Sequence, residues 1–150
     1  MKVKDIMTGS PCFCASGTDL EQVARLLTEH DCGAIPVVDD EDFPRPVGIV
    51  TDRDIVCRVV AAGEDPSLLT AGDCMSSPVV TVAPVTRLDV CCELMERNKV
   101  RRLVVVDEDG FCCGIVSQAD IARRATEKTA EVLKEVSQPT HGASAVSASM

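Results

Sequence analysis

A stretch of eight residues occurs twice in this 150-residue chain, and this repeat constrains the fold more than any other feature. Residues 48–55 read GIVTDRDI and residues 114–121 read GIVSQADI. Both copies have glycine, two β-branched residues, a hydroxyl residue, two variable positions, aspartate and isoleucine, in that order. Self-similarity at a long fixed period indicates that the fold is built from repeated structural units.

The correspondence between the two copies extends over most of the chain. Residues 5–7 (DIM) match residues 73–75 (DCM), and residues 35–39 (IPVVD) match residues 103–107 (LVVVD). The first copy has two extra residues in the polar, proline-containing segment 40–46, where a hairpin loop tolerates a difference in length.

Five segments follow from this alignment. A half of roughly 60 residues buries too little surface to be stable alone, so we expect the two repeats to pack as one module around a shared core. The end of the chain is rich in Ser and Ala without apolar periodicity, which is typical of disorder. The expected segments are a first repeat over 2–63, a linker over 64–70, a second repeat over 71–126, a helix extension over 127–136 and a disordered tail over 137–150.

Each repeat predicts the element order strand, helix, strand, strand, helix. Residues 20–27 carry an apolar helical stripe, preceded by Thr18 at the spacing of a capping box. Residues 34–38 and 47–50 are short runs rich in β-branched residues, and a helical pattern follows Thr51. The sequence therefore predicts an α/β (α+β) fold with two pseudo-symmetric β-α-β-β-α repeats.

Composition excludes several classes of partner. The net charge is −9, which disfavours binding to nucleic acid. No run approaches the ~18 apolar residues of a membrane span, and the N-terminus lacks the basic-then-apolar order of a signal peptide. We therefore expect a cytoplasmic protein that binds neither nucleic acid nor membrane.

Nine cysteines require an explanation. Because the chain has no Cys-x-x-Cys spacing, no metal site is expected. Five cysteines stand where the other copy has an aliphatic residue, which predicts buried structural thiols; they are Cys32, Cys74, Cys91, Cys92 and Cys113. A cysteine-based redox sensor remains an alternative, and it would require an accessible thiolate of low pKa at residues 12–14 or 112–113.

The repeated hydroxyl-x-x-aspartate pattern has two interpretations. Thr51 with Asp54, and Ser117 with Asp120, stand where a strand passes into a helix, so backbone N–H groups and the positive end of a helix dipole meet there. A carboxylate at this place could accept two hydrogen bonds from a ribose diol. The same spacing is that of a capping box, which stabilises a helix without any ligand.

Two adjacent arginines form the second candidate feature. Arg101 and Arg102 precede the strand expected over 103–106, in the densest basic segment of an acidic chain. Guanidinium groups suit phosphate oxygens, although exposed arginines also pair with surface acids. The first copy has Gly33 and Ala34 at these positions, so we expect two clefts that are not equivalent.

With these motifs the chain resembles the CBS-domain family, as a tandem pair forming one Bateman module over about residues 2–126. The resemblance rests on the two Asp-x-Met segments, on residues 33–39 (GAIPVVD) and on both glycine-to-aspartate stretches. Residues 51–56 (TDRDIV) are similar to small stand-alone bacterial CBS-pair proteins. Residues 100–107 resemble a repeat of the AMP-activated kinase gamma subunit, where a basic pair lies near nucleotide phosphates.

The resemblance implies clefts between the repeats for an adenosyl ligand such as AMP, ATP, NAD(H) or S-adenosylmethionine, with no required cofactor. By position, the aspartates would hold ribose, the hydroxyl residues ribose or phosphate, and the arginines phosphate. The base would rest on the first strand of each repeat, after Pro11 or Pro78. The implied ligand-binding residues are Thr51, Asp54, Ser117, Asp120, Arg101, Arg102, Ala34 and Pro36.

The sequence therefore predicts a regulatory binding module rather than an enzyme, since no constellation of catalytic residues is recognisable. A structural dimerisation module with empty clefts is a further alternative. Family resemblance implies a homodimer, and an unidentified protein partner would receive the signal. We expect the dimer to form through apolar helix faces around Leu26, Leu27, Ile55, Val59, Leu94, Met95 and Ile121.

Overall fold

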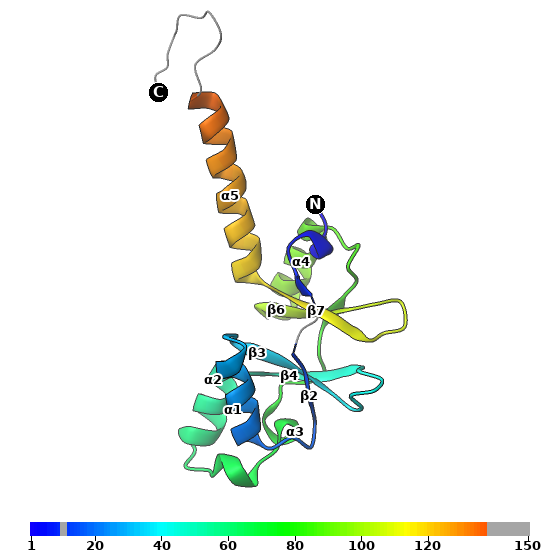
Figure 1. Ribbon diagram of the computed structural model, residues 1–150, viewed down its shortest axis with the longest axis vertical. Coiled ribbons are helices and arrows are strands. Elements are labelled where there is room, and N and C mark those ends of the chain that lie inside the picture. The colour runs from blue at the N-terminus through cyan, green and yellow to red at the C-terminus, as the bar shows by residue number, and fades with distance from the viewer. Residues whose placement is uncertain (10–11, 138–150) are drawn as a thin grey trace, which may run out of the picture.

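The computed structural model describes residues 1–9 and 12–137, and Figure 1 shows two α/β halves joined side by side. The first half has a three-stranded sheet in the order β2-β3-β4. β2 runs parallel to β3, and β3 runs antiparallel to β4. Its elements are β2 (Cys14–Ala15), α1 (Leu20–Glu29), β3 (Ala34–Val38), β4 (Pro46–Thr51) and α2 (Asp52–Ile55), which continues as a π-helical turn (Val56–Val60).

The second half repeats this plan with one additional strand from the N-terminus. Its sheet has the order β1-β7-β6-β5, in which β5 is parallel to β6 and the other pairs are antiparallel. The predicted α/β fold of two β-α-β-β-α repeats is confirmed. The elements are β1 (Thr8–Gly9), β5 (Thr81–Val82), α4 (Leu88–Asn98), β6 (Arg102–Val106), β7 (Cys112–Ser117) and α5 (Gln118–Ser137).

The short segment that precedes each repeat in the sequence packs on the half formed by the other repeat. The 3₁₀ turn Val3–Asp5 and β1 pack on the second half, and Val3 is completely buried there. Conversely, a second 3₁₀ turn (Pro66–Leu68) leads into α3 (Ala71–Cys74), and Ala71 and Cys74 are buried in the first half. This exchange holds the repeats together as one module.

Each half nevertheless has a hydrophobic core of its own. One cluster is centred on Leu20, Ile35 and Val50, and the other on Leu103 and Val116. The expectation of one shared core is therefore wrong. The exchanged segments supply the additional apolar residues that a half of this size needs.

The exchange also explains the repeated Asp-x-Met segments. Asp5 and Asp73 accept hydrogen bonds from the backbone N–H groups of Lys2 and Thr70, at 2.8 and 2.9 Å, and so begin their short helical turns. The methionine two residues after each aspartate, Met7 or Met75, packs on a glycine that belongs to the other repeat. A Cβ at Gly48 would lie 2.5 Å from Met75 Sδ, and one at Gly114 would lie 2.8 Å from Met7 Sδ.

Several local expectations need correction. The N-cap of α1 is Asp19, whose carboxylate accepts from Gln22 N–H at 2.9 Å, and not Thr18. Cys32 and Cys92 are exposed, although the repeat comparison predicted burial, whereas Cys74 and Cys91 are buried as expected. Cys32 lies in the turn between α1 and β3, and Cys92 lies on the solvent-facing side of α4, because correspondence between repeats does not fix exposure.

The helix faces expected to form a dimer are partly used inside the chain. Leu27, Val59 and Met95 are between 1% and 8% exposed because they belong to the two cores. No helix within residues 1–9 and 12–137 is long and apolar enough to cross a membrane. Pro11 lies outside the described residues, and so does the expected disordered tail except for its first residue. That residue, Ser137, ends α5.

Candidate functional site

A cavity of about 640 Å³ lies where the two halves meet. It is bounded on one side by the end of β4 and the start of α2, and on the other by the turn between α4 and β6. Ser76, which follows α3, contributes to its wall and pairs with Ile49 in an isolated antiparallel bridge. Its lining residues are Ile49, Thr51, Asp52, Arg53, Asp54, Ser76, Lys99, Val100, Arg101 and Arg102.

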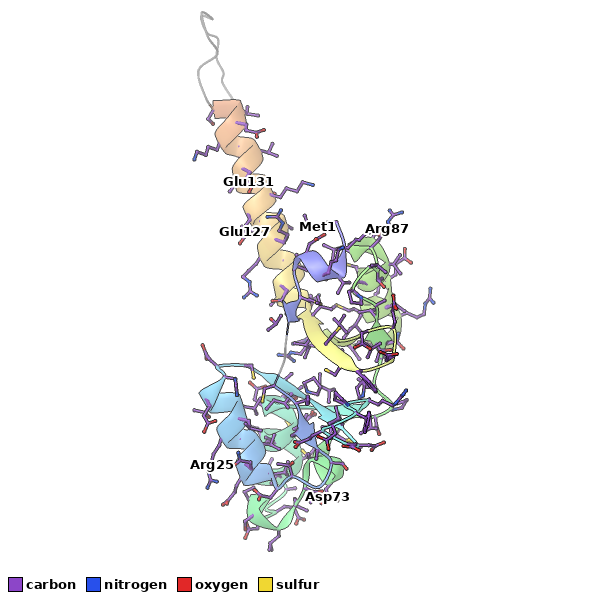
Figure 2. All side chains as sticks on the ribbon, turned by 45° about the vertical axis from the view of Figure 1, so that its right-hand side comes forward. Met1, Arg25, Asp73, Arg87, Glu127 and Glu131 are labelled. Atoms are coloured by element: carbon purple, nitrogen blue, oxygen red, sulfur yellow. The ribbon has the colours of Figure 1, made fainter. Side chains whose placement is uncertain are left out.

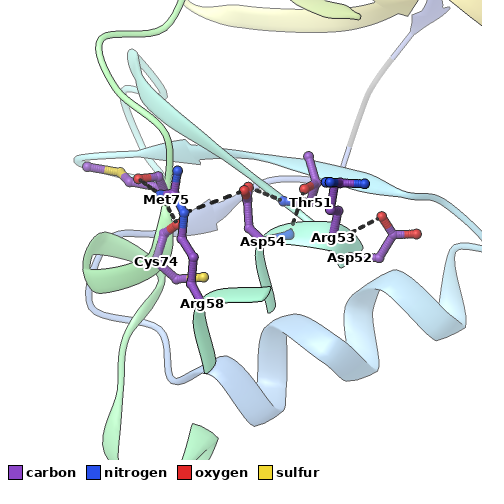
Figure 3. Close-up of polar contacts among 7 residues, drawn as sticks. All are labelled: Thr51, Asp52, Arg53, Asp54, Arg58, Cys74 and Met75. Atoms are coloured by element: carbon purple, nitrogen blue, oxygen red, sulfur yellow. Dashed lines mark hydrogen bonds and ion pairs between the residues drawn. The ribbon is translucent and has the colours of Figure 1, made fainter. Parts of the chain in front are cut away.

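Thr51 and Asp54 are held at this cavity by a complete capping box. Thr51 is extended, with φ −114° and ψ 162°, and the chain turns into α2 at the next residue. Thr51 Oγ1 accepts from Asp54 N–H at 3.0 Å, and Asp54 Oδ2 accepts from Thr51 N–H at 3.0 Å. Figure 3 shows these reciprocal contacts. The helix-cap interpretation of the pattern is therefore correct, and both side chains also line the cavity.

The second carboxylate oxygen of Asp54 has no hydrogen-bond donor among the described residues. Arg58 Nε lies 3.9 Å from Asp54 Oδ1, beyond hydrogen-bonding distance. The guanidinium of Arg58 instead donates to the carbonyl of Cys74 at 3.1 Å, on the segment exchanged between the halves (Figure 3). Asp54 Oδ1 is therefore an acceptor with capacity left for a ligand.

Basic side chains dominate the polar part of the cavity wall. Four lining residues are basic and two are acidic, in a chain whose net charge is −9. Arg53, Lys99, Arg101 and Arg102 form no ion pair within 4.0 Å with any acid among the described residues. The alternative that the arginines are neutralised by surface acids is therefore wrong for this part of the chain. Unpaired cations in a concave surface attract anions.

Local backbone geometry brings these basic residues to the cavity. Lys99 ends α4 in the left-handed conformation, with φ 55°, so the chain turns sharply toward β6. Arg101 O accepts from Gln118 N–H at 2.8 Å, which fixes the entrance of β6 against the start of α5. Arg102 lies over Gly33, since a Cβ at Gly33 would be 3.0 Å from Arg102 Nη2.

The arginine pair thus serves both halves. Arg101 and Arg102 also line a second cavity of about 450 Å³, together with Ser117 and Gln118. The sequence assigned the arginines to one cleft and Gly33 and Ala34 to the other. In the fold the arginines line both cavities, and neither cavity is lined by Gly33 or Ala34, so this assignment is wrong.

Asp120 differs from Asp54 in its surroundings. It forms the same capping box, accepting from Ser117 N–H at 2.8 Å, while Ser117 Oγ accepts from Asp120 N–H at 3.1 Å. Its other oxygen, however, accepts from the Arg123 guanidinium. Asp120 lines a cavity of about 200 Å³ with Asp5 and Arg123, which does not include Ser117.

The remaining expected site residues do not line these cavities. Ala34 and Pro36 are buried within β3, and Pro78 is exposed. Asp52, Arg53 and Ser76 are lining residues that sequence reasoning missed. The two variable positions of the repeated motif, 52 and 53, gave no signal because they differ between the copies.

The thiols named for a redox role have unfavourable surroundings. Burial raises the pKa of Cys14 to about 12 and that of Cys112 to about 11. Burial also raises the pKa of Cys12 and of Cys113 above the ordinary value. A reactive thiolate requires the opposite shift.

Two α/β repeats that exchange segments and share a basic cavity define a tandem-repeat module. The family model described as "CBS domain" matches residues 3–61 and 71–127. The chain therefore belongs to the CBS-domain family and contains a pair of these domains.

Curated relatives include proteins of similar length. Hypoxic response protein 1 of Mycobacterium tuberculosis is 37% identical over 124 residues, covering 83% of this chain and 85% of that protein. The CBS domain-containing protein YhcV of Bacillus subtilis is 32% identical, covering 90% and 94%. MK0525 of Methanopyrus kandleri, an uncharacterized protein, is 37% identical over 79% of this chain, which spans 57% of that protein's length.

Solved structures agree with the fold. The CBS domain pair of protein MJ0100, in complex with 5'-methylthioadenosine and S-adenosyl-L-methionine, gives a TM-score of 0.75 at 28% identity, covering 85% of this chain and 98% of that chain. Hypoxic Response Protein I with two coordinated zinc ions gives 0.71 at 36% identity, covering 82% and 98%. CBSX2 in complex with AMP gives 0.69 at 26% identity, covering 85% and 98%.

Proposed function

We propose that this protein is a regulatory binding module that holds an adenine nucleotide in the cavity between β4–α2 and the α4–β6 turn. Phosphate lies against Arg101, Arg102 and Lys99. The ribose hydroxyls donate to Asp54, and Thr51 lies beside them. The observation that carries the proposal is that four basic side chains without an ion pair among the described residues line one cavity together with Asp54, whose Oδ1 accepts no hydrogen bond from those residues.

The solved relatives support the ligand class, because one of them is a complex with AMP and another a complex that includes S-adenosylmethionine. Charge distinguishes between these two. S-adenosylmethionine carries a sulfonium cation, which the basic cavity wall would repel, whereas AMP carries a phosphate that guanidinium groups bind bidentately. A nucleotide is therefore the expected occupant of this cavity.

The proposal does not include zinc. Within residues 1–9 and 12–137 no three His, Cys, Asp or Glu side chains are grouped as a metal site would require. Nor does it include a catalytic role. Ligand binding across the two halves would change how firmly they are held together, and a partner or a second copy would respond to that change.

A thermal-shift comparison of AMP, ATP, NADH and S-adenosylmethionine, with adenosine as the uncharged reference, tests the proposal. A ligand that binds only the folded state at about 100 times its Kd adds about 2.7 kcal/mol to the free energy of unfolding. We expect AMP or ATP to raise the melting temperature more than adenosine or S-adenosylmethionine. If none of the four raises it, the cavities are empty and the structural-module alternative is favoured.

A further inference from the structure

Helix α5 is much longer than its counterpart in the first half, and the additional part leaves the body. It spans Gln118–Ser137, whereas the equivalent helix ends at Val60. Figure 1 shows α5 projecting away from both sheets, and in Figure 2 Glu127 and Glu131 extend into open space. The projecting part continues beyond residue 127, where the match to the CBS-domain family ends.

No residue of α5 is buried. Val132, Leu133 and Val136 are 51%, 61% and 77% exposed, near the projecting end. Helices are held mainly by tertiary packing of an apolar face, so a projecting helix with exposed valine and leucine lacks its usual source of stability.

The apolar positions of α5 follow a coiled-coil spacing. Five residues recur at intervals of three, four, three and four, which places them on one seam. Thr129 is the polar member, and its hydroxyl donates to Ala125 O at 2.9 Å, so it brings no unpaired donor to the seam. The seam residues are Ala122, Ala125, Thr129, Val132 and Val136.

We propose that this seam pairs antiparallel with the α5 seam of a second copy. The charges beside the seam select this direction. Lys128 and Glu135 occupy equivalent flanking positions one heptad apart, and neither forms an ion pair within 4.0 Å among the described residues. In an antiparallel pair, such positions face each other across the seam. Lys128 of each copy then lies opposite Glu135 of the other copy, which gives two ion pairs.

The same register matches residue sizes along the seam. It places Ala125 opposite Val136 of the second copy and Thr129 opposite Val132. Leu133, which flanks the seam on the other side, then faces Thr126. A parallel pair would instead place Lys128 beside Leu133, with no charge complement.

A groove on the body continues this surface. A cavity of about 640 Å³ between α4 and α5 is lined by apolar side chains that include Met95, Ile121, Ala122 and Ala125. In the antiparallel register Val136 of the second copy reaches this groove. Lys99, Arg101 and Glu96 also line the groove, and the two basic side chains would complement the negative C-terminal end of the incoming helix. This surface shares Met95 and Ile121 with the helix faces expected from the sequence and adds the seam of α5 to them.

Sedimentation of the full-length protein tests the pairing. Val132→Glu places a charge in the seam of both copies, and Ala130→Glu places the same charge on the opposite face as a matched control. We expect Val132→Glu to raise the dissociation constant of the assembly at least about tenfold, and Ala130→Glu to change it less than about threefold. A monomeric wild type at micromolar concentration, or equal behaviour of the two variants, would overturn the proposal.

A charge exchange tests the direction. Lys128→Glu and Glu135→Lys each create two like-charge contacts in an antiparallel pair, while the double variant restores both ion pairs in reversed order. Each single variant should therefore weaken association, and the double variant should recover most of it. Association that is unaffected by the single changes, or not recovered in the double variant, would overturn the antiparallel arrangement.

Discussion

Asp54 and Asp120 occupy the same position in the repeat, but they differ in the surroundings of the carboxylate oxygen that the capping box does not use. Both accept a backbone N–H through a capping box. Arg123 donates to the second oxygen of Asp120, whereas the second oxygen of Asp54 accepts no hydrogen bond among the described residues and lies 3.9 Å from Arg58 Nε; Asp54 lines the basic cavity. The motif predicts two equivalent ligand residues, and their surroundings favour Asp54.

Replacing each aspartate by alanine separates the cap from the ligand contact. Both changes remove a cap, which costs about 1 kcal/mol of stability. Asp54→Ala should in addition weaken AMP binding by about 1.5–3 kcal/mol, the contribution of hydrogen bonds to a charged group. Asp120→Ala is the matched control and should leave AMP binding in the cavity between β4–α2 and the α4–β6 turn nearly unchanged. Titration calorimetry of AMP measures both affinities, and equal losses would contradict the assignment to Asp54.

The buried thiols predict how stability depends on pH. Burial raises the pKa of Cys14 from 9.0 to about 12 and that of Cys91 to about 11, so the folded state holds these protons more tightly than the unfolded state. Stability from this source is complete below the unfolded pKa and is lost as pH rises from about 9 to about 12. Urea unfolding at pH about 8 and about 10.5 should therefore show a decrease in the free energy of unfolding.

Two variants identify the source of this decrease. Cys14→Ala should make the decrease smaller, while Cys57→Ala, at an exposed thiol, should leave it as in the wild type. The same decrease in both variants would show that Cys14 is not responsible.

At the scale of elements, the exchanged segments explain why both copies of the repeated stretch begin with glycine. At Gly48 a Cβ would also lie 3.0 Å from Ser76 O, which is a backbone atom that cannot move aside as a side chain can. The methionine and the glycine of one contact belong to different repeats in sequence. The repeat pattern shows that both residues recur, but it does not show that they meet across the exchange.

Gly48→Ala should therefore destabilise the protein by about 1–3 kcal/mol, the usual cost of overpacking a fitted core. Gly17→Ala is a suitable control, because a Cβ at Gly17 has no neighbour within 4 Å. Chemical denaturation measures both variants. A Gly48→Ala protein as stable as Gly17→Ala would contradict the close packing of Met75 on Gly48.

The sequence predicted the elements of the repeat well, since hydrophobic periodicity and β-branched runs are local signals. It placed the α1 cap at Thr18 because Thr18 and Glu21 have capping-box spacing, whereas Asp19 accepts the hydrogen bond. It also predicted one core where two exist. Core membership depends on how the segments around Val3 and Ala71 cross between the halves, and a one-dimensional pattern does not contain that crossing.

At the scale of the whole molecule, the two halves together form the wall of one basic cavity. Thr51 and Asp54 come from the first repeat, and Lys99, Arg101 and Arg102 from the second. Sequence reasoning identified Thr51, Asp54 and the two arginines as site residues, but not Lys99 and not their grouping, because the pairing of β4–α2 with the α4–β6 turn is set by packing between the halves. Asp52 and Arg53 join the same cavity from positions that the repeat does not preserve.

The most direct measurement of the central claim is calorimetric binding of AMP and adenosine to the wild type and to the double variant Arg101→Gln/Arg102→Gln. Glutamine keeps polarity while it removes charge, and Arg25→Gln/Arg87→Gln is a charge-matched control at exposed arginines outside the cavity. We predict that only the cavity variant loses AMP affinity, by at least about tenfold, and that its adenosine affinity changes far less. The AMP affinity of the wild type should also weaken as salt is added. Equal losses for AMP and adenosine, or no loss for either, would contradict the central claim.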